Sequence, residues 1–218
     1  MGADIESIMK GYNDPRLSKY FQESEYGEVG DKLHGARLGV NITNKTNYVK
    51  LSAPNIFAET PVQWMCAAEV YFLRAEGRLH GWNMGGEMEG LYNTGITKSF
   101  EQWGVSLGDY LTRGDEYKPV PFTAPSGTTG SAVAASTITI AWNAVDRDEK
   151  KLERIITQKW IAMFPEGQEA WSEYRRTGYP KLFNLYGTNA SSGQVDASGP
   201  RRIPLPSTEY DTNTTEVN

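Results

Sequence analysis

Aromatic rings and amide side chains are the residues of this sequence whose types and spacing suit ligand binding. A carbohydrate needs flat rings for the apolar faces of its pyranoses, and amide, carboxylate or guanidinium groups for its hydroxyls. That mixture occurs between residues 22 and 59, where no helical or strand period is sustained, and again in a glycine-rich link. The candidate carbohydrate-binding residues are Tyr26, Arg37, Asn41, Asn47, Tyr48, Asn55, Trp82 and Asn83. The alternative, that each of them only packs its own loop, stays open.

Arrangements for catalysis or metal binding are weaker. Paired carboxylates can hydrolyse glycosides, but the two pairs in this chain lie near predicted helix starts, where acidic residues simply stabilise the helix dipole: Glu87 with Glu89, and Glu166 with Glu169. His34 and His80 lie far apart and have no partner at metal-ligand spacing. The sequence has no glycine-rich phosphate loop. We therefore expect a binding protein and not an enzyme, with neither metal nor cofactor.

Composition bounds the class of protein. The chain has 218 residues, enough for one domain or for part of a larger one, and a formal net charge of −5. This acidic balance argues against a nucleic-acid surface, which needs a basic face. The one cysteine, Cys66, excludes an intrachain disulfide. The sequence has no apolar run of about twenty residues to span a membrane, and its first residues lack the pattern of a signal peptide.

The elements that must position the candidate residues are mostly helices, and the strongest helical pattern lies between residues 152 and 183. Pro165 ends a first helix because it lacks an N–H, and a second helix is predicted from about Glu166 to Thr177, before Gly178. Arg175-Arg176 at the end of this second helix favours pairing with a carboxylate elsewhere in the fold. The apolar stripe of the first helix consists of Leu152, Ile155, Ile156, Trp160 and Met163.

A helical hairpin is predicted earlier in the chain. Thr60-Pro61-Val62-Gln63 has the residues of a helix start, and Gly81 ends that helix. Gly85-Gly86 links it to a second helix that ends at Gly104. Two such helices resemble a tetratricopeptide unit, although no period of about 34 residues is present. The apolar face of the first helix is predicted to be Trp64, Ala68, Tyr71, Phe72, Ala75 and Leu79.

Long irregular segments separate these elements. A short helix is predicted at 106–113, a weakly supported strand at 137–142, and an extended tail from Arg201, where Pro204 and Pro206 oppose a helix. The chain is therefore predicted to be mainly α: an irregular helical domain with long loops and little strand. Residues 1–218 form one domain in this interpretation. The segments expected to be loops are 22–59, 115–135 and 184–199.

Four stretches, in order along the chain, resemble the SusD/RagB-like outer-membrane nutrient-binding lipoproteins. The most specific is IITQKWIAMFPEGQEAWSEYRRTGYP, and the others are GYNDPRLSKYF from Gly11, PVQWMCAAEVYFLRAEG from Pro61 and RRIPLPSTEY from Arg201. The resemblance covers nearly the whole chain but only about the C-terminal half of a full family member. It implies a SusD-like helical fold in which the N-terminal half carries most of the tetratricopeptide-like helices.

The resemblance also implies a function. It predicts capture of an oligosaccharide at the surface of a Gram-negative bacterium, and hand-off to a SusC-like TonB-dependent outer-membrane transporter. The signal peptide and the lipid anchor to the outer membrane would lie outside this chain. Two alternatives stay open: a peptide-binding relative in nutrient uptake, and a helical interaction scaffold without a small ligand.

Overall fold

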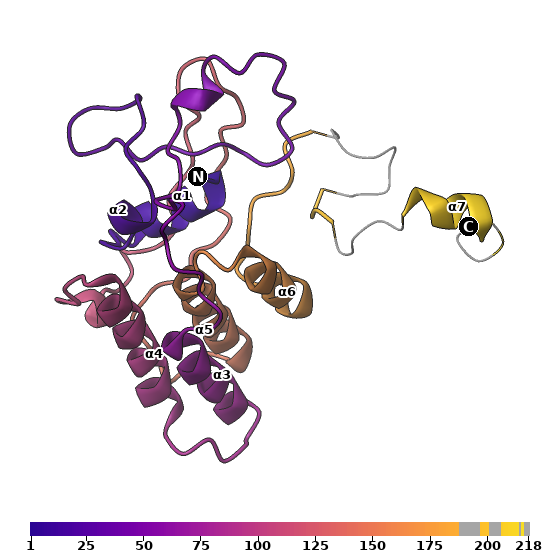
Figure 1. Ribbon diagram of the computed structural model, residues 1–218. Helices are drawn as coiled ribbons and strands as arrows, with labels where there is room; N and C mark the ends of the chain where they lie inside the picture. The colour runs from indigo at the N-terminus through magenta and orange to yellow at the C-terminus, as the bar shows by residue number, and fades with distance from the viewer. Residues whose placement is uncertain (188–196, 201–205, 214, 216–218) are drawn as a thin grey trace.

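The computed structural model describes residues 1–187, 197–200, 206–213 and 215, and shows helices joined by long loops (Figure 1). Within these residues it contains no strand, and only isolated bridges such as Phe122 with Ala132. The mainly helical fold predicted from the sequence is confirmed. The helices are α1 (Ala3–Gly11), α2 (Leu17–Tyr20), α3 (Ala67–Leu79), α4 (Met88–Trp103), α5 (Asp148–Ala162), α6 (Gly167–Thr177) and α7 (Ser207–Thr212), with 3-10 turns η1 (Tyr48–Lys50) and η2 (Tyr110–Thr112).

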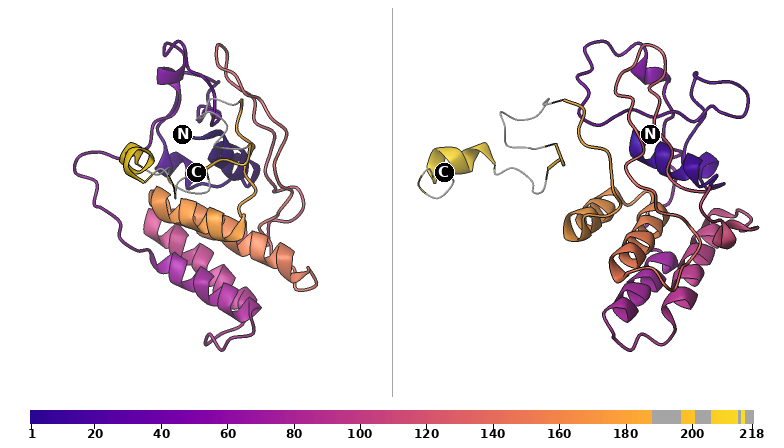
Figure 2. Two further views of the ribbon diagram at one scale, coloured as in Figure 1. Left: turned by 90° about the vertical axis from the view of Figure 1, so that its right-hand side faces the viewer. Right: turned by 180° about the vertical axis from the view of Figure 1, so that it is seen from behind.

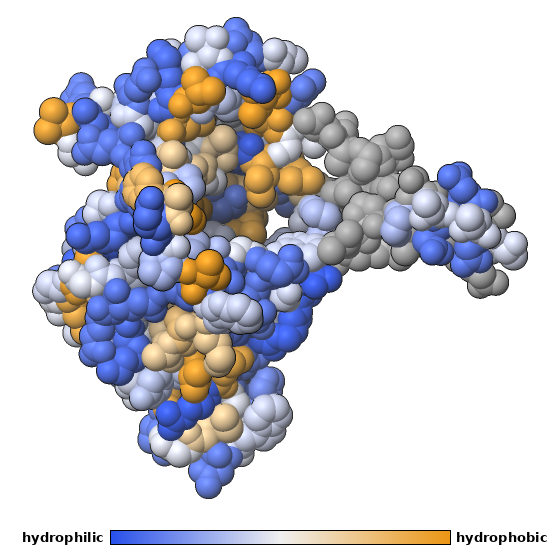
Figure 3. All heavy atoms as spheres, in the orientation of Figure 1, coloured by the Kyte–Doolittle hydropathy of each residue, from blue (hydrophilic) through white to orange (hydrophobic). Residues whose placement is uncertain are grey.

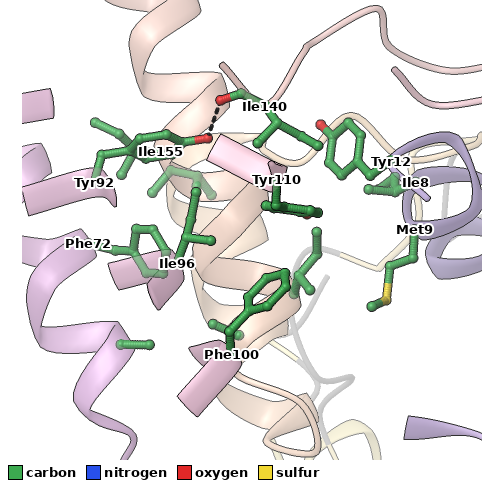
Figure 4. Close-up of a cluster of buried hydrophobic side chains, with 14 of the residues drawn as sticks. Ile8, Met9, Tyr12, Phe72, Tyr92, Ile96, Phe100, Tyr110, Ile140 and Ile155 are labelled. Carbon is green, nitrogen blue, oxygen red and sulfur yellow. Dashed lines mark hydrogen bonds between the residues drawn. The ribbon is translucent and has the colours of Figure 1, made fainter. Parts of the chain in front are cut away.

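Helices α3 and α4 form the predicted hairpin, and α5 packs against it (Figures 1 and 2). Gly95 lets α4 approach α3 closely, since a Cβ at this position would lie 2.9 Å from the ring of Phe72. Tyr92 reaches beyond the hairpin and donates its hydroxyl to the carbonyl of Ile140 at 2.8 Å (Figure 4). The core is therefore continuous from the hairpin to the segment before α5.

The turn between α1 and α2 carries a buried ion pair. Asn13 takes a positive φ of 48°, and the carboxylate of Asp14 then accepts hydrogen bonds from Arg16 at 3.0 and 2.5 Å. Arg16 also donates to Ser99 at 2.8 Å, and Tyr110 donates to Asp14 at 2.6 Å. Both charges are thus paired and hydrogen-bonded in the interior, as buried charges must be. The stretch GYNDPRLSKYF is a structural motif that ties α1 to α4 and η2.

A second charged network holds α6 against α3 and α5. Arg176 makes a bidentate contact with Glu76 of α3, at 2.6 and 2.8 Å, and also pairs with Glu173 at 2.8 Å. Lys159 of α5 is 1% exposed and lies between Glu173 at 3.2 Å and Glu69 at 3.5 Å. The predicted pairing of the Arg175-Arg176 segment with a distant carboxylate is confirmed at Arg176.

The predicted start of α3 is wrong by about six residues. Thr60 caps no helix: its hydroxyl accepts the backbone N–H of Phe57, at 2.8 Å. Gln63 bonds across to Gln102 of α4 at 2.5 Å, so these side chains serve tertiary contacts. The helix begins after Cys66, whose backbone is extended. Trp64 therefore does not join the apolar face of α3 and is 90% exposed.

Two smaller predictions also differ from the structure. Residues 137–142 form no strand: the carbonyls of Ile138 and Ile140 accept hydrogen bonds from the hydroxyls of Tyr12, just after α1, and of Tyr92 in α4. The tail is not extended throughout, since α7 follows Pro206; a proline suits the start of a helix, where its missing N–H costs nothing. Residues 201–205, the first half of the RRIPLPSTEY stretch, lie outside the described residues.

Candidate functional site

Two loops far apart in the sequence meet at one end of the molecule, at the top of Figure 1. One loop contains residues 22–59 and the other residues 119–136. Asn47 donates its amide to the carbonyl of Gly127 at 3.1 Å, and the hydroxyls of Tyr48 and Thr129 lie 3.4 Å apart. Tyr26 donates to the carbonyl of Asn47 at 2.9 Å. Three of the predicted site residues thus share one loop cluster.

Arg37 joins this loop cluster from the other side of the second loop. Gly130 packs directly on it, since a Cβ at that glycine would lie 2.7 Å from the Cγ of Arg37. The guanidinium lies 4.5 Å from the ring centre of Phe183. Its Nη2 atom donates a hydrogen bond to the carbonyl of Asn184. Burial lowers the pKa of Arg37, although the charge of Asp4 opposes this shift.

The guanidinium of Arg37 is incompletely hydrogen-bonded. Its Nε and Nη1 atoms are buried and have no hydrogen-bond partner. Buried polar atoms are nearly always paired, and an unpaired donor costs free energy that the fold must supply elsewhere. Arg37 is therefore held in place by the ring of Phe183 and by one backbone carbonyl rather than by a carboxylate in contact.

Tyr186 belongs to the same loop cluster and was missed in the sequence, where residues 184–199 resembled a small polar loop. Its backbone N–H donates to the carbonyl of Leu38 at 2.9 Å, and its ring lies beside Gly130. The residue remains 45% exposed, so part of it is accessible to a ligand. A signal was present, because a tyrosine followed by Gly187 in an otherwise small and polar segment places a ring on a turn.

The remaining residues of the first loop have different surroundings. Asn41 is exposed in the loop, and Asn55 donates its amide to the carbonyl of Lys19 at 3.0 Å. Asn55 also lines a hollow of about 340 Å³ together with Phe21 and Leu33. The amide of Asn55 is thus partly used in fixing the loop to α2.

Trp82 and Asn83 lie away from the loop cluster, in the link between α3 and α4 at the bottom of Figure 1. Trp82 is 62% exposed and its ring centre lies 5.5 Å from that of His80. Asn83 accepts the backbone N–H of Gly85, at 3.4 Å, within the link. The eight predicted residues therefore do not form one site, because the hairpin places these two at the opposite end of the molecule.

The surface of the loop cluster is mixed in character. In Figure 3 apolar groups are scattered among polar ones over the upper loops. Such a surface offers apolar contact together with hydrogen-bond partners, which is what sugar recognition uses. The exposed apolar residues of these loops include Leu38, Ile42, Val49, Val133 and Tyr186.

The glutamate pairs and histidines weighed for catalysis lie in ordinary surroundings. Glu87 and Glu89 are exposed at the start of α4, and Glu87 receives a 3.4 Å contact from Arg78. His34 lies 3.3 Å from Glu6, and His80 lies on the surface at the end of α3. Among the residues described, no three His, Cys, Asp or Glu side chains are grouped to hold a metal. In the same part of the chain, no helix combines the length and apolar character that crossing a bilayer requires.

Comparison with known proteins identifies the family. Its model, described as SusD and RagB outer membrane lipoprotein, matches residues 1–218. A SusD homologue from Bacteroides uniformis is 44% identical, with a TM-score of 0.91 over 99% of this chain and 45% of that chain. A SusD homologue from Bacteroides thetaiotaomicron is 42% identical, with a TM-score of 0.88 over 98% of this chain and 45% of that one.

A third solved structure is of a homologue that binds chitin. A chitin-binding SusD homologue from Flavobacterium johnsoniae is 44% identical to this chain, with a TM-score of 0.88 over 100% of this chain and 45% of its own. No match was found among curated proteins. The chain thus spans somewhat less than half the length of these three solved relatives. With a family match over its full length and relatives above 40% identity, this chain belongs to the SusD-like family of outer membrane lipoproteins.

Proposed function

We propose that this chain is part of a surface-exposed outer-membrane protein that captures an oligosaccharide and hands it to a SusC-like TonB-dependent transporter. Family membership supports a nutrient-binding role. The chitin-binding homologue, at 44% identity, supports a glycan as the ligand. The chain corresponds to one domain, the C-terminal part of a longer SusD-like protein.

The loop cluster carries this proposal. Tyr186 is 45% exposed beside Gly130, Tyr48 is half-buried against Thr129 of the same loop, and Asn47 supplies a polar group at the same end. Aromatic rings stack on the apolar faces of pyranoses, while amides and hydroxyls bind their hydroxyl groups. Binding of this kind needs no covalent step, and an open surface favours release to a transporter.

Isothermal titration with chitohexaose, beside hexamers of glucose, mannose and xylose, tests the proposal. We expect saturable binding of at least one glycan to the protein. Tyr186→Ala should weaken this binding at least tenfold, because it removes a half-exposed ring that packs beside Gly130 of the second loop. Tyr48→Ala should weaken it less. Trp82→Ala is the matched control, since it removes a ring that is even more exposed, 62% against 45% for Tyr186, at the opposite end.

The outcomes separate the alternatives. Loss of binding in Trp82→Ala but not in Tyr186→Ala would move the site to the α3–α4 link. No binding across the glycan panel, with binding of a peptide library, would favour a peptide-binding relative. Binding of neither class would leave the helical scaffold as the better account.

A further inference from the structure

The segment that leads into α3 exposes more large apolar side chains than any comparable stretch of the described chain. Ile56 is 45% exposed and Phe57 60%, while Val62, Trp64 and Met65 are exposed at 80%, 90% and 69%. We call these five residues the apolar strip. Scattered apolar residues are normal on a surface, but a contiguous group of this size marks an interaction surface.

A hollow lies beside the apolar strip. It has a volume of about 430 Å³, and its walls come from the strip segment, the end of α4 and the turn between α5 and α6. Trp103 lines the hollow, and its indole Nε1 atom is buried without a hydrogen-bond partner. The side-chain amides of Gln63 and Gln102 lie in the same wall and bond to each other.

The strip segment stands away from the helices that it precedes. In Figure 2 (left) it bows out from the body before it enters α3. The outward side of α3 then carries Val70 and Leu73, which are 40% and 43% exposed and one helical turn apart. Figure 3 shows orange surface over this helix. Apolar exposure thus continues from the strip onto a helix face.

The chemistry of the apolar strip fits a polypeptide better than a sugar. All five side chains of the strip are apolar, and only two of them, Phe57 and Trp64, are rings. The amides nearest to them already bond to each other or to backbone. A branched, aliphatic surface beside a hollow with an apolar wall is suited to the side chains of a packed helix.

We propose that the apolar strip and its hollow are the docking surface for the further polypeptide that SusD-like relatives carry beyond the matched region. These relatives superpose on essentially all of this chain, yet the match covers 45% of their own length. More than half of such a protein must therefore pack outside the fold described above. The occupant is an apolar helical face of that polypeptide, within the same protein.

A chimaera tests the proposal. This chain replaces the matched region of the Bacteroides uniformis homologue, and Trp64→Cys is introduced both in the chimaera and in the chain alone. Cys66 is buried and gives a low background. Maleimide labelling at position 64 should be fast in the chain alone and at least tenfold slower in the chimaera. Val145→Cys, at a position 89% exposed and remote in sequence from the strip, should label equally in both.

A second readout needs no label. Trp64→Asp should lower the melting temperature of the chimaera by at least 5 °C and leave that of the isolated chain unchanged, while Val145→Asp should change neither. Equal labelling at position 64 in both proteins would overturn the proposal, as would two separate unfolding transitions in the chimaera. Protection of position 64 that grows with the concentration of the isolated chain would also overturn it, and would assign the strip to a second copy.

Discussion

Two buried arginines show how differently the helical core and the loop cluster are built. In the core, the guanidinium of Arg16 is paired with Asp14 and donates to Ser99. In the loop cluster, Arg37 donates one nitrogen to the carbonyl of Asn184, while its Nε and Nη1 atoms are unpaired. We call the first arrangement a closed network, because the guanidinium is paired with a carboxylate, and the second an open one, because two nitrogens lack a partner.

The two arginines lie in segments that are held in different ways. Arg16 lies in the stretch GYNDPRLSKYF, whose residues bond to the backbone and side chains of α4, α5 and η2, so the motif specifies the fold. Arg37 lies in a loop that has three glycines at positive φ, Gly27, Gly30 and Gly39, and that contacts the second loop through the amide of Asn47. The motif around Arg16 therefore acts in the fold, whereas the loop around Arg37 is the part of the chain in which we propose ligand binding.

The largest effect is expected in the closed network. Asp14→Ala removes the partner of Arg16 and leaves a fully buried charge unpaired, so the free energy of unfolding should fall by about 3–5 kcal/mol. Urea denaturation of both proteins measures this change. The matched control is Asp109→Ala, which breaks an exposed pair with Arg113 and should cost less than about 1 kcal/mol. Similar losses in the two variants would show that burial does not set the strength of the network.

Acid should weaken the second core network. Burial would raise the pKa of Glu173, but hydrogen bonds from Arg176 and the charge of Lys159 outweigh it and lower the pKa below its usual 4.5. A lowered pKa in the folded state contributes stability above pH 4.5, and this contribution is lost as the pH falls through the folded-state value. Urea midpoints at pH 6 and pH 3.5 should therefore differ more for the wild-type protein than for Glu173→Gln. An equal difference would exclude Glu173 as a source of acid sensitivity.

Much of the helical core is predictable from the sequence, because its signals are local. Pro165 and Gly178 bound α6, and of the predicted apolar stripe Ile155, Ile156 and Met163 are buried while Leu152 and Trp160 are half-buried. The start of α3 was misplaced because the side chains of Thr60 and Gln63 are used in tertiary contacts, which outweigh a local capping pattern.

The candidate site was only partly predictable, because it depends on contacts between distant segments. The composition of one loop pointed to Tyr48 and Arg37, but nothing local shows that residues 125–130 lie on both of them. Trp82 has the same ring and amide signature, yet the length of the hairpin carries it to the other end. Tyr186 was missed because its significance lies in its neighbours in space.

Replacing the second arginine sharpens the comparison. Arg37→Leu should lower the free energy of unfolding by at most about 1 kcal/mol, because two nitrogens lose no hydrogen bond and an aliphatic stem still packs on Phe183. Arg16→Leu, in contrast, leaves the buried carboxylate of Asp14 without its countercharge, with the hydroxyl of Tyr110 still donating to it, and should cost about 3–5 kcal/mol. Chemical denaturation of the pair measures both. A loss above 3 kcal/mol for Arg37→Leu would mean that its single carbonyl bond and its ring contact fix the loop cluster.

The smallest effect is expected when the hydroxyl of Tyr48 is removed, and the matched variant in the core is Tyr92→Phe. Tyr48→Phe removes a long 3.4 Å contact with Thr129 at the surface, so the free energy of unfolding should change by no more than about 0.5 kcal/mol. Tyr92→Phe removes the same atom in the core and leaves the carbonyl of Ile140 buried without that donor, which should cost about 1–3 kcal/mol. Thermal melts and urea titrations of the two variants test the contrast. If Tyr48→Phe proved as costly as Tyr92→Phe, the contact between the two loops would contribute as much stability as a buried hydrogen bond of the core, and the contrast between the two regions would fail.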